Sequence, residues 1–185
     1  MPILAKEVYV MKQIEIPSDV DVSIQGKKVR VKGKNGELEK DFSDAKGITI
    51  KLEQNKVIVE TFFANSKKKA MAGTIIAHIR NMIMGVTKGY RYKLKIIYSH
   101  YPISVKVDKD KLIISNFIGE RSNRVAKILP SVNLKVQGND IIVEGIDIEK
   151  VGQTAANIES ATKITEFDRR KFMDGIYIYK REVIA

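Results

Sequence analysis

Residues 50–60, with the sequence IKLEQNKVIVE, recur 84 positions later as residues 134–144, with the sequence LKVQGNDIIVE. Both stretches alternate apolar and polar residues, turn at an asparagine and then run apolar as far as a glutamate. Such alternation is typical of strands, and Asn or Gly supplies the backbone angles that a tight turn needs. Each stretch therefore predicts a β-hairpin, and the recurrence predicts an internally duplicated chain.

Two further strands are predicted before each hairpin. Residues 20–31 read as two short strands around a polar turn at 25–27, and residues 103–114 read the same way around a turn at 108–110. A Gly-Glu pair then follows in both repeats. Short strands joined by such turns favour antiparallel sheets.

A helix is predicted after each hairpin. Apolar or small residues recur there at helical spacing, at Met71, Ile75, Ile79, Met82 and Ile83 in the first repeat and at Val151, Thr154, Ala155, Ile158 and Ala161 in the second. We expect Asn65 or Ser66 to cap the first helix, Gly85 to end it, and Asp147 to cap the second.

The predicted fold class is α+β, with two tandem homologous domains, each an antiparallel sheet with a helix packed on one face. The strand at residues 90–97 is expected to close the first domain, with Arg91, Lys93 and Lys95 together on one of its faces. The predicted domains are therefore residues 1–99 and 100–185. Residues 163–185 have no counterpart in the first repeat, so this basic extension is where function is sought first.

Composition narrows the class of protein. The chain of 185 residues has 33 Lys and Arg against 22 Asp and Glu, a formal charge of +11, which points to a polyanionic partner such as nucleic acid or else only to solubility. Cysteine is absent, which excludes disulfides, thiolate nucleophiles and cysteine metal sites. No apolar run approaches the roughly 18 residues of a membrane span, and the first residues do not resemble a signal peptide, so a cytoplasmic location without membrane contact is expected.

No catalytic constellation is present in the sequence. His78 and His100 are isolated from other metal-ligating residues, which favours structural roles for both. Asp108 and Asp110 lack the glycine and distal glutamate of a calcium loop, and a strand turn explains them better. The glycines of the first repeat lie between predicted strands and do not open a helix as a phosphate loop would. We therefore expect no enzyme, no cofactor and no metal.

Two basic clusters precede the extension. Lys67, Lys68 and Lys69 lie at the start of the first helix, where bound anions would relieve unfavourable charge, although a solvated first turn is an equal alternative. Arg121, Arg124 and Lys127 are predicted in a loop, where arginines suit bidentate phosphate contacts and a mobile loop can fit an RNA groove. A merely solvated loop is the alternative there.

The third cluster lies in the C-terminal extension and mixes cations with aromatic rings. Its members are Lys163, Arg169, Arg170, Lys171, Lys180 and Arg181, interleaved with Phe167, Phe172, Tyr177 and Tyr179. Cations for phosphates and flat rings for bases or sugars are the ingredients of RNA binding. Phe172 and Tyr177 can equally serve to anchor the extension to the second domain.

Several stretches spread over the whole chain resemble the large-subunit ribosomal protein six family, whose eukaryotic members carry the number nine. The stretches that carry the resemblance are residues 81–93, 116–120, 138–147, 151–158 and 170–177. The last is similar to the archaeal and eukaryotic ending, and the bacterial Pro-Tyr-Lys-Gly-Lys-Gly ending is absent. The resemblance therefore points to the archaeal branch.

The resemblance implies a structural protein of the large ribosomal subunit that binds 23S-type rRNA, mainly through its second domain. It also implies a place near the stalk base and the sarcin–ricin loop, beside neighbouring ribosomal proteins and close to translation GTPases. The candidate rRNA-binding residues are Arg121, Arg124, Lys127, Gly152, Gln153, Lys163, Arg169, Arg170, Lys171, Phe172, Gly175 and Tyr177, with Lys67, Lys68 and Lys69 as a secondary patch.

Two questions stay open at the level of sequence. Gly152 and Gly175 can permit close approach of RNA to the backbone, but Gly175 can equally be a plain turn residue. The alternative function is a non-ribosomal basic module that binds proteins or RNA.

Overall fold

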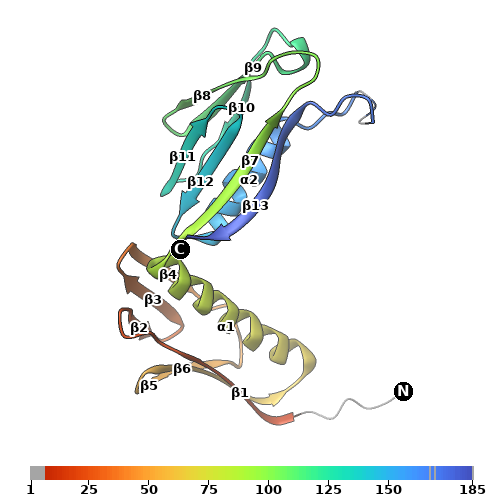
Figure 1. Cartoon of the computed structure of the whole chain (residues 1–185). Coiled ribbons are helices and arrows are strands. Elements are labelled where there is room, and N and C mark those ends of the chain that lie inside the picture. Colours follow the sequence, from red (N-terminus) through yellow and green to blue (C-terminus); the bar gives the residue numbers. More distant parts are fainter. Residues whose placement is uncertain (1–6, 167, 169, 185) are drawn as a thin grey trace, which may run out of the picture. The chain divides into compact units, whose positions relative to one another are not determined.

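The computed structural model describes residues 7–166, 168 and 170–184, which form two compact units, Met1–Thr87 and Lys88–Ala185 (Figure 1). Both units combine antiparallel sheets with one helix, so the predicted α+β fold is confirmed.

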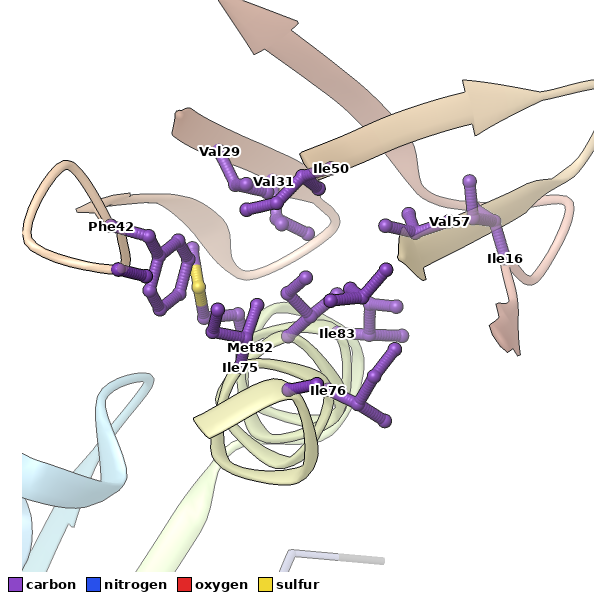
Figure 2. Close-up of a cluster of buried hydrophobic side chains, with 14 of the residues drawn as sticks. Ile16, Val29, Val31, Phe42, Ile50, Val57, Ile75, Ile76, Met82 and Ile83 are labelled. Atoms are coloured by element: carbon purple, nitrogen blue, oxygen red, sulfur yellow. The ribbon is translucent and has the colours of Figure 1, made fainter. Parts of the chain in front are cut away.

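The first unit contains two three-stranded sheets and a long helix. Its elements are β1 (Glu7–Glu15), β2 (Asp21–Gln25), β3 (Lys28–Gly33), β4 (Gly36–Asp41), β5 (Thr49–Glu53), β6 (Lys56–Ala64) and α1 (Ser66–Thr87). The sheets have the strand orders β1-β6-β5 and β2-β3-β4, and α1 contacts strands of both. Figure 2 shows helix side chains such as Ile75 and Ile83 packed toward Val31, Ile50 and Val57 of the sheets.

The second unit has a three-stranded and a four-stranded sheet around a shorter helix. Its elements are β7 (Tyr90–Ile97), β8 (Ser104–Asp108), β9 (Lys111–Ser115), a 3-10 turn η1 (Phe117–Gly119), β10 (Arg124–Lys127), β11 (Val132–Gln137), β12 (Asp140–Gly145), α2 (Ile148–Ala161) and β13 (Gly175–Val183). The sheets have the strand orders β10-β9-β8 and β11-β12-β7-β13. The α2 residues Val151, Ala155 and Ile158 are fully buried in the core of this unit.

The two units repeat the same strand pairings, as the recurring hairpins predict. The hairpins are β5–β6 and β11–β12, and each second strand pairs next with the first strand of its unit, β1 or β7. The same backbone hydrogen bond recurs at the turn: Ile16 N donates to Asn55 O at 2.9 Å, and Ile96 N donates to Asn139 O at 2.8 Å. β7 is therefore the counterpart of β1, and among the described strands β13 is the one without a counterpart in the first unit.

This pairing overturns the predicted boundary. The strand at residues 90–97 does not close the first unit, because it lies between β12 and β13 in the sheet of the second. The structure divides the chain after Thr87, and not between residues 99 and 100. Strand periodicity showed that a strand exists there, but it carries no information on which hairpin the strand joins.

The helix signals are only partly confirmed. Asn65 Oδ1 accepts from Lys68 N at 2.9 Å and Asp147 Oδ1 accepts from Glu149 N at 2.9 Å, so both caps form. Gly85 does not end α1, since it is buried within a helix that runs on to Thr87. Met71 is 45% exposed and lies beside the buried face instead of in it.

We expect Ile79→Ala to lower the free energy of unfolding by about 2–5 kcal/mol, because Ile79 has no exposed surface and its loss leaves a cavity. Met71→Ala on the same helix is the control and should change it by less than about 0.5 kcal/mol. Urea denaturation of both variants measures the difference, and equal effects would contradict the assigned helix face.

Candidate nucleic-acid interface

One face of the four-stranded sheet carries paired charges. Arg91 Nε contacts Glu144 Oε1 at 2.5 Å, and Lys93 Nζ contacts Glu182 Oε1 at 3.1 Å. Lys95 pairs with Asp140 in the same way, at 3.1 Å. The prediction that Arg91, Lys93 and Lys95 share a face is thus confirmed, and cross-strand pairing of this kind stabilises a sheet.

The same network reaches the added strand. Lys180 Nζ contacts Glu182 Oε2 at 2.6 Å, and hydrogen bonds from Lys180 and then from Lys93 lower the pKa of Glu182. On β13 the Arg181 guanidinium lies 5.7 Å from the centre of the Tyr92 ring. Lys180 and Arg181, predicted as part of the third basic cluster, are therefore already engaged within the sheet.

Arg124 lies in β10 and not in a loop, and its guanidinium is engaged within the protein. Nε and Nη2 donate to the two carboxylate oxygens of Glu120, at 2.9 and 2.6 Å, while Nη1 donates to the carbonyls of Ala161 and Lys163. The guanidinium also lies 4.3 Å from the centre of the Phe117 ring. These bonds use all three nitrogens, so Arg124 joins β10 to the end of α2 instead of presenting a free cation.

The other two members of that cluster are exposed. Arg121 lies in the connection between η1 and β10, and Lys127 ends β10. Beside Lys127, Asn157 of α2 donates to the Lys127 carbonyl at 3.0 Å, and Gln153 donates to Asn157 at 2.9 Å. The predicted residue Gln153 thus contributes to a polar contact between α2 and β10.

Residues 162–174, here named the connecting segment, lead from α2 to β13 and present several cations. Thr162 and Ile164 are buried and anchor its start, and Thr162 Oγ1 accepts from Ile176 N at 3.0 Å. Lys163 and Lys171 are exposed, and the Arg170 side chain is 93% exposed beside Asp168. The predicted residues Phe167 and Arg169 lie outside the described residues.

Asp174 anchors the other end of the connecting segment. Its side chain is 1% exposed, and Oδ1 accepts from the backbone N–H groups of Ser99 and His100 at 2.6 and 3.3 Å. Oδ2 lies 3.2 Å from His100 Nδ1, and the His100 ring packs 4.8 Å from that of Phe172. Phe172 therefore serves to anchor the segment, and His100 has the structural role predicted for it.

The environment of Asp174 acts on its ionisation in two opposing ways. Burial raises the pKa of its carboxyl, but hydrogen bonds from Ser99 and His100 favour the charged form, and their sum lowers the pKa below its usual value. A carboxylate held in this way stabilises the folded chain only while it is ionised.

The two candidate glycines differ in what surrounds them. A Cβ on Gly152 would meet the Tyr92 ring at 3.7 Å, an ordinary contact, so packing within the chain does not require glycine there. A Cβ on Gly175 would lie 2.9 Å from the Tyr177 ring, and Gly175 itself is buried as the first residue of β13. Gly175 thus makes room for Tyr177 and is not a plain turn residue.

The structure brings part of the predicted set together. Tyr177 and Lys163 line one surface depression with Glu159, Ser160 and Thr162. Arg124 Nη1 donates to the Lys163 carbonyl, so Lys163 lies beside β10. Arg121 lies in the connection that leads into β10. Gln153 lies about 12 Å from this end of α2, given the rise of an α-helix. Lys67, Lys68 and Lys69 form the first turn of α1 in the other unit.

Of the paired sheet face, sequence reasoning named only Lys180 as a member of a basic cluster and did not predict the ion pairs. The signal for it was the spacing of Arg91, Lys93 and Lys95 at every second position. Within the described residues, no group of three His, Asp or Glu side chains could hold a metal ion. None of the described helices is long and apolar enough to cross a membrane.

We expect Arg124→Ala to lower the free energy of unfolding by about 2–3 kcal/mol, because Glu120 and two carbonyls lose a charged donor. Arg124→Lys should recover only part of the loss, since an ammonium cannot reproduce the planar guanidinium contacts. Arg121→Ala removes an exposed arginine as the control and should cost less than about 0.5 kcal/mol. Thermal denaturation compares the three, and a neutral Arg124→Ala would contradict the structural role.

Asp174 predicts a loss of stability in acid. Its folded-state pKa is lowered, so its contribution is present above the unfolded pKa of about 3.9 and is lost as pH falls through the lower folded value. Asp174→Asn should therefore be less stable than the parent chain at pH 7, and the gap should shrink below about pH 4. Urea denaturation at pH values from about 2.5 to 7, on both sides of the unfolded pKa of about 3.9, measures the difference in free energy of unfolding between the two chains. A difference that stays constant over this range would contradict the prediction.

Comparison with known proteins agrees with this architecture. The profile of the family described as ribosomal protein L6 matches residues 16–89 and 101–175, one match in each repeat. The chain is 61% identical to large ribosomal subunit protein uL6 of Aeropyrum pernix, over 98% of this chain and 100% of the relative. It is 63% identical to uL6 of Ignicoccus hospitalis, over 98% of this chain and 100% of the relative. It is 47% identical to uL6 of Methanothrix thermoacetophila, over 93% of this chain and 97% of the relative. The chain belongs to the ribosomal protein L6 family, on its archaeal branch.

Proposed function

We propose that this chain is a structural constituent of the large ribosomal subunit in the cytoplasm and binds 23S-type rRNA through its second unit. The observation that carries the proposal is its full-length similarity to large ribosomal subunit proteins, combined with exposed cations on the connecting segment. Its relatives are ribosomal proteins and not enzymes, as the sequence predicts. The proposed place is near the stalk base and the sarcin–ricin loop, among neighbouring ribosomal proteins and close to translation GTPases.

The proposed rRNA contacts are those cations of the candidate set that the protein leaves exposed. They are Arg121, Lys127, Lys163, Arg170 and Lys171. They lie on the connecting segment and on β10 with the turn before it, segments that the Arg124 side chain joins. Contacts from such side chains to phosphates set the position and orientation of a protein on RNA, while the shape of the RNA supplies selectivity.

The aromatic residues and glycines have a secondary place in this proposal. Tyr177 beside Lys163 can offer a ring to a sugar or an unstacked base at the depression that both line. Gly152 and Gln153 are exposed or half-exposed near the start of α2 and would contribute at the margin of the contact. Lys67, Lys68 and Lys69, in the first turn of α1, are the proposed secondary patch on the first unit.

Five phosphate contacts predict a strong salt dependence. Each neutralised phosphate contributes about −0.7 to −0.9 to the slope of log affinity against log salt, so five give a slope of about −4. Affinity should then fall by roughly 250-fold between 50 and 200 mM salt.

Filter binding to a large-subunit rRNA fragment that contains the sarcin–ricin region tests the proposal, with an unrelated structured RNA of equal length as competitor. Arg170→Glu combined with Lys171→Glu should weaken binding at least tenfold, because two attractive charges become repulsive. Lys32→Glu combined with Lys34→Glu changes the net charge equally at exposed positions of the first unit and is the control.

Equal losses in the two double variants would show a generic polyanion surface and overturn the assigned interface. Retention of the chain on large subunits through a high-salt wash separates the proposed role from that of a non-ribosomal module, which would wash away.

A further inference from the structure

Among the described strands, none pairs with the outer edge of β1, whereas the same edge of β7, the counterpart of β1, is covered by β13. In the second unit β13 lies alongside β7 and pairs with it antiparallel along its length (Figure 1). In the first unit β1 takes the place of β7, and no described strand pairs with its other edge. The same fold thus exists in this chain with that edge filled and with it open.

The backbone groups that face the open edge follow from the shared register. Ile16 and Ile96 occupy equivalent positions, as their hydrogen bonds to Asn55 and Asn139 show. In the second unit Gly89 O accepts from Ile184 N at 3.0 Å on the covered side. Because backbone groups alternate in direction along a strand, Tyr9, Met11 and Gln13 of β1 turn their N–H and C=O groups to the open edge.

The side chains at this edge are apolar and exposed. Val8, Tyr9 and Met11 of β1 and Phe62 and Phe63 of β6 have between 45% and 68% of their surface exposed. The rings of Tyr9 and Phe62 lie 5.2 Å apart. A long edge strand with apolar side chains and unpaired backbone groups is a ready template for another strand, and proteins normally block such edges with charges or prolines.

Charge along β1 does little to block the edge. The Lys12 ammonium lies over Gly73 of α1, so it points away from an incoming strand. The Glu15 side chain is 79% exposed at the end of β1, with Lys56 at 3.0 Å. The uncharged centre at Val8–Met11 and this carboxylate define the complementary chemistry: apolar residues opposite the centre and a basic residue near Glu15.

A second copy of β13 does not have that chemistry. Opposite Arg91 and Lys93, β13 places Glu182 and Lys180, which belong to the ion-pair network of the second unit. The positions of β1 equivalent to Arg91 and Lys93 are Met11 and Gln13, which are uncharged. A strand with charged residues there would lose its partners, and RNA would leave the backbone groups and apolar side chains unmatched.

We propose that an extended segment of a neighbouring large-subunit protein adds to the open edge of β1 as an antiparallel strand. Main-chain hydrogen bonds to Tyr9, Met11 and Gln13 provide affinity, and the apolar side chains around Met11 with Glu15 provide selectivity. The proposal rests on assembly into the large subunit and is independent of the rRNA contacts assigned to the second unit.

Photo-crosslinking combined with hydrogen exchange tests it. Met11 is replaced by p-benzoylphenylalanine in chains assembled into large subunits, and Met71, equally exposed on α1, is replaced as the control. After irradiation, nuclease and protease digestion, mass spectrometry identifies what is attached. Exchange of the amides of Tyr9, Met11 and Gln13 is compared between the isolated chain and the assembled subunit, where we expect it to slow by about tenfold or more.

A crosslink from position 11 to a peptide of another protein, absent from position 71, together with protected amides supports strand addition. A crosslink to rRNA or to a second copy of this chain, or amides that exchange as in the isolated chain, overturns it. Met11→Lys should weaken retention on the subunit relative to Met71→Lys while leaving affinity for the rRNA fragment unchanged. A loss of rRNA binding in Met11→Lys would also count against the proposal, and the rRNA-binding assay by itself tests the second unit.

Discussion

Burial of one apolar helix face against two small sheets is the constraint on which each unit depends. The helices and the strands both supply fully buried residues, such as Ile79 of α1 with Val31 of β3 in the first unit and Ile158 of α2 with Leu94 of β7 in the second. Units of about 90 residues have little apolar surface to spare, so the helix face, its cap and the strands it touches must form together. The strand pairings that hold this helix face recur in both units.

The second constraint is that the edge strand of a sheet presents unpaired backbone N–H and C=O groups. The two units differ in how this edge is covered. In the second unit β13 covers β7, and the side chains of Thr162 and Glu159 accept from the N–H groups of Ile176 and Ile178 on the far side of β13. In the first unit no described strand covers the corresponding edge of β1, so its backbone groups are available to pair with another strand.

Positive charge in this chain serves two physical purposes. Arg124 and the cations of the four-stranded sheet are paired with carboxylates and carbonyls, and they hold elements of the second unit together. Arg121, Lys163, Arg170 and Lys171 lie exposed around them. The count of 33 Lys and Arg residues therefore overstates how many cations are available to a polyanion, while the net charge of +11 is unchanged because each ion pair neutralises one charge of each sign.

The sequence by itself determined the duplication, the hairpins, the caps at Asn65 and Asp147, and the basic character of the chain. These features are local: alternation, helical spacing and turn residues act through neighbours along the chain. Of the candidate site, it identified the exposed cations of the connecting segment, Lys163, Arg170 and Lys171. Only the tertiary structure decided that β7 joins the second unit, that Arg124 binds Glu120, and that Gly175 makes room for Tyr177. Strand pairing and side-chain partners are contacts between residues distant in sequence, and residue periodicity carries no information on which edge or which carboxylate will be near.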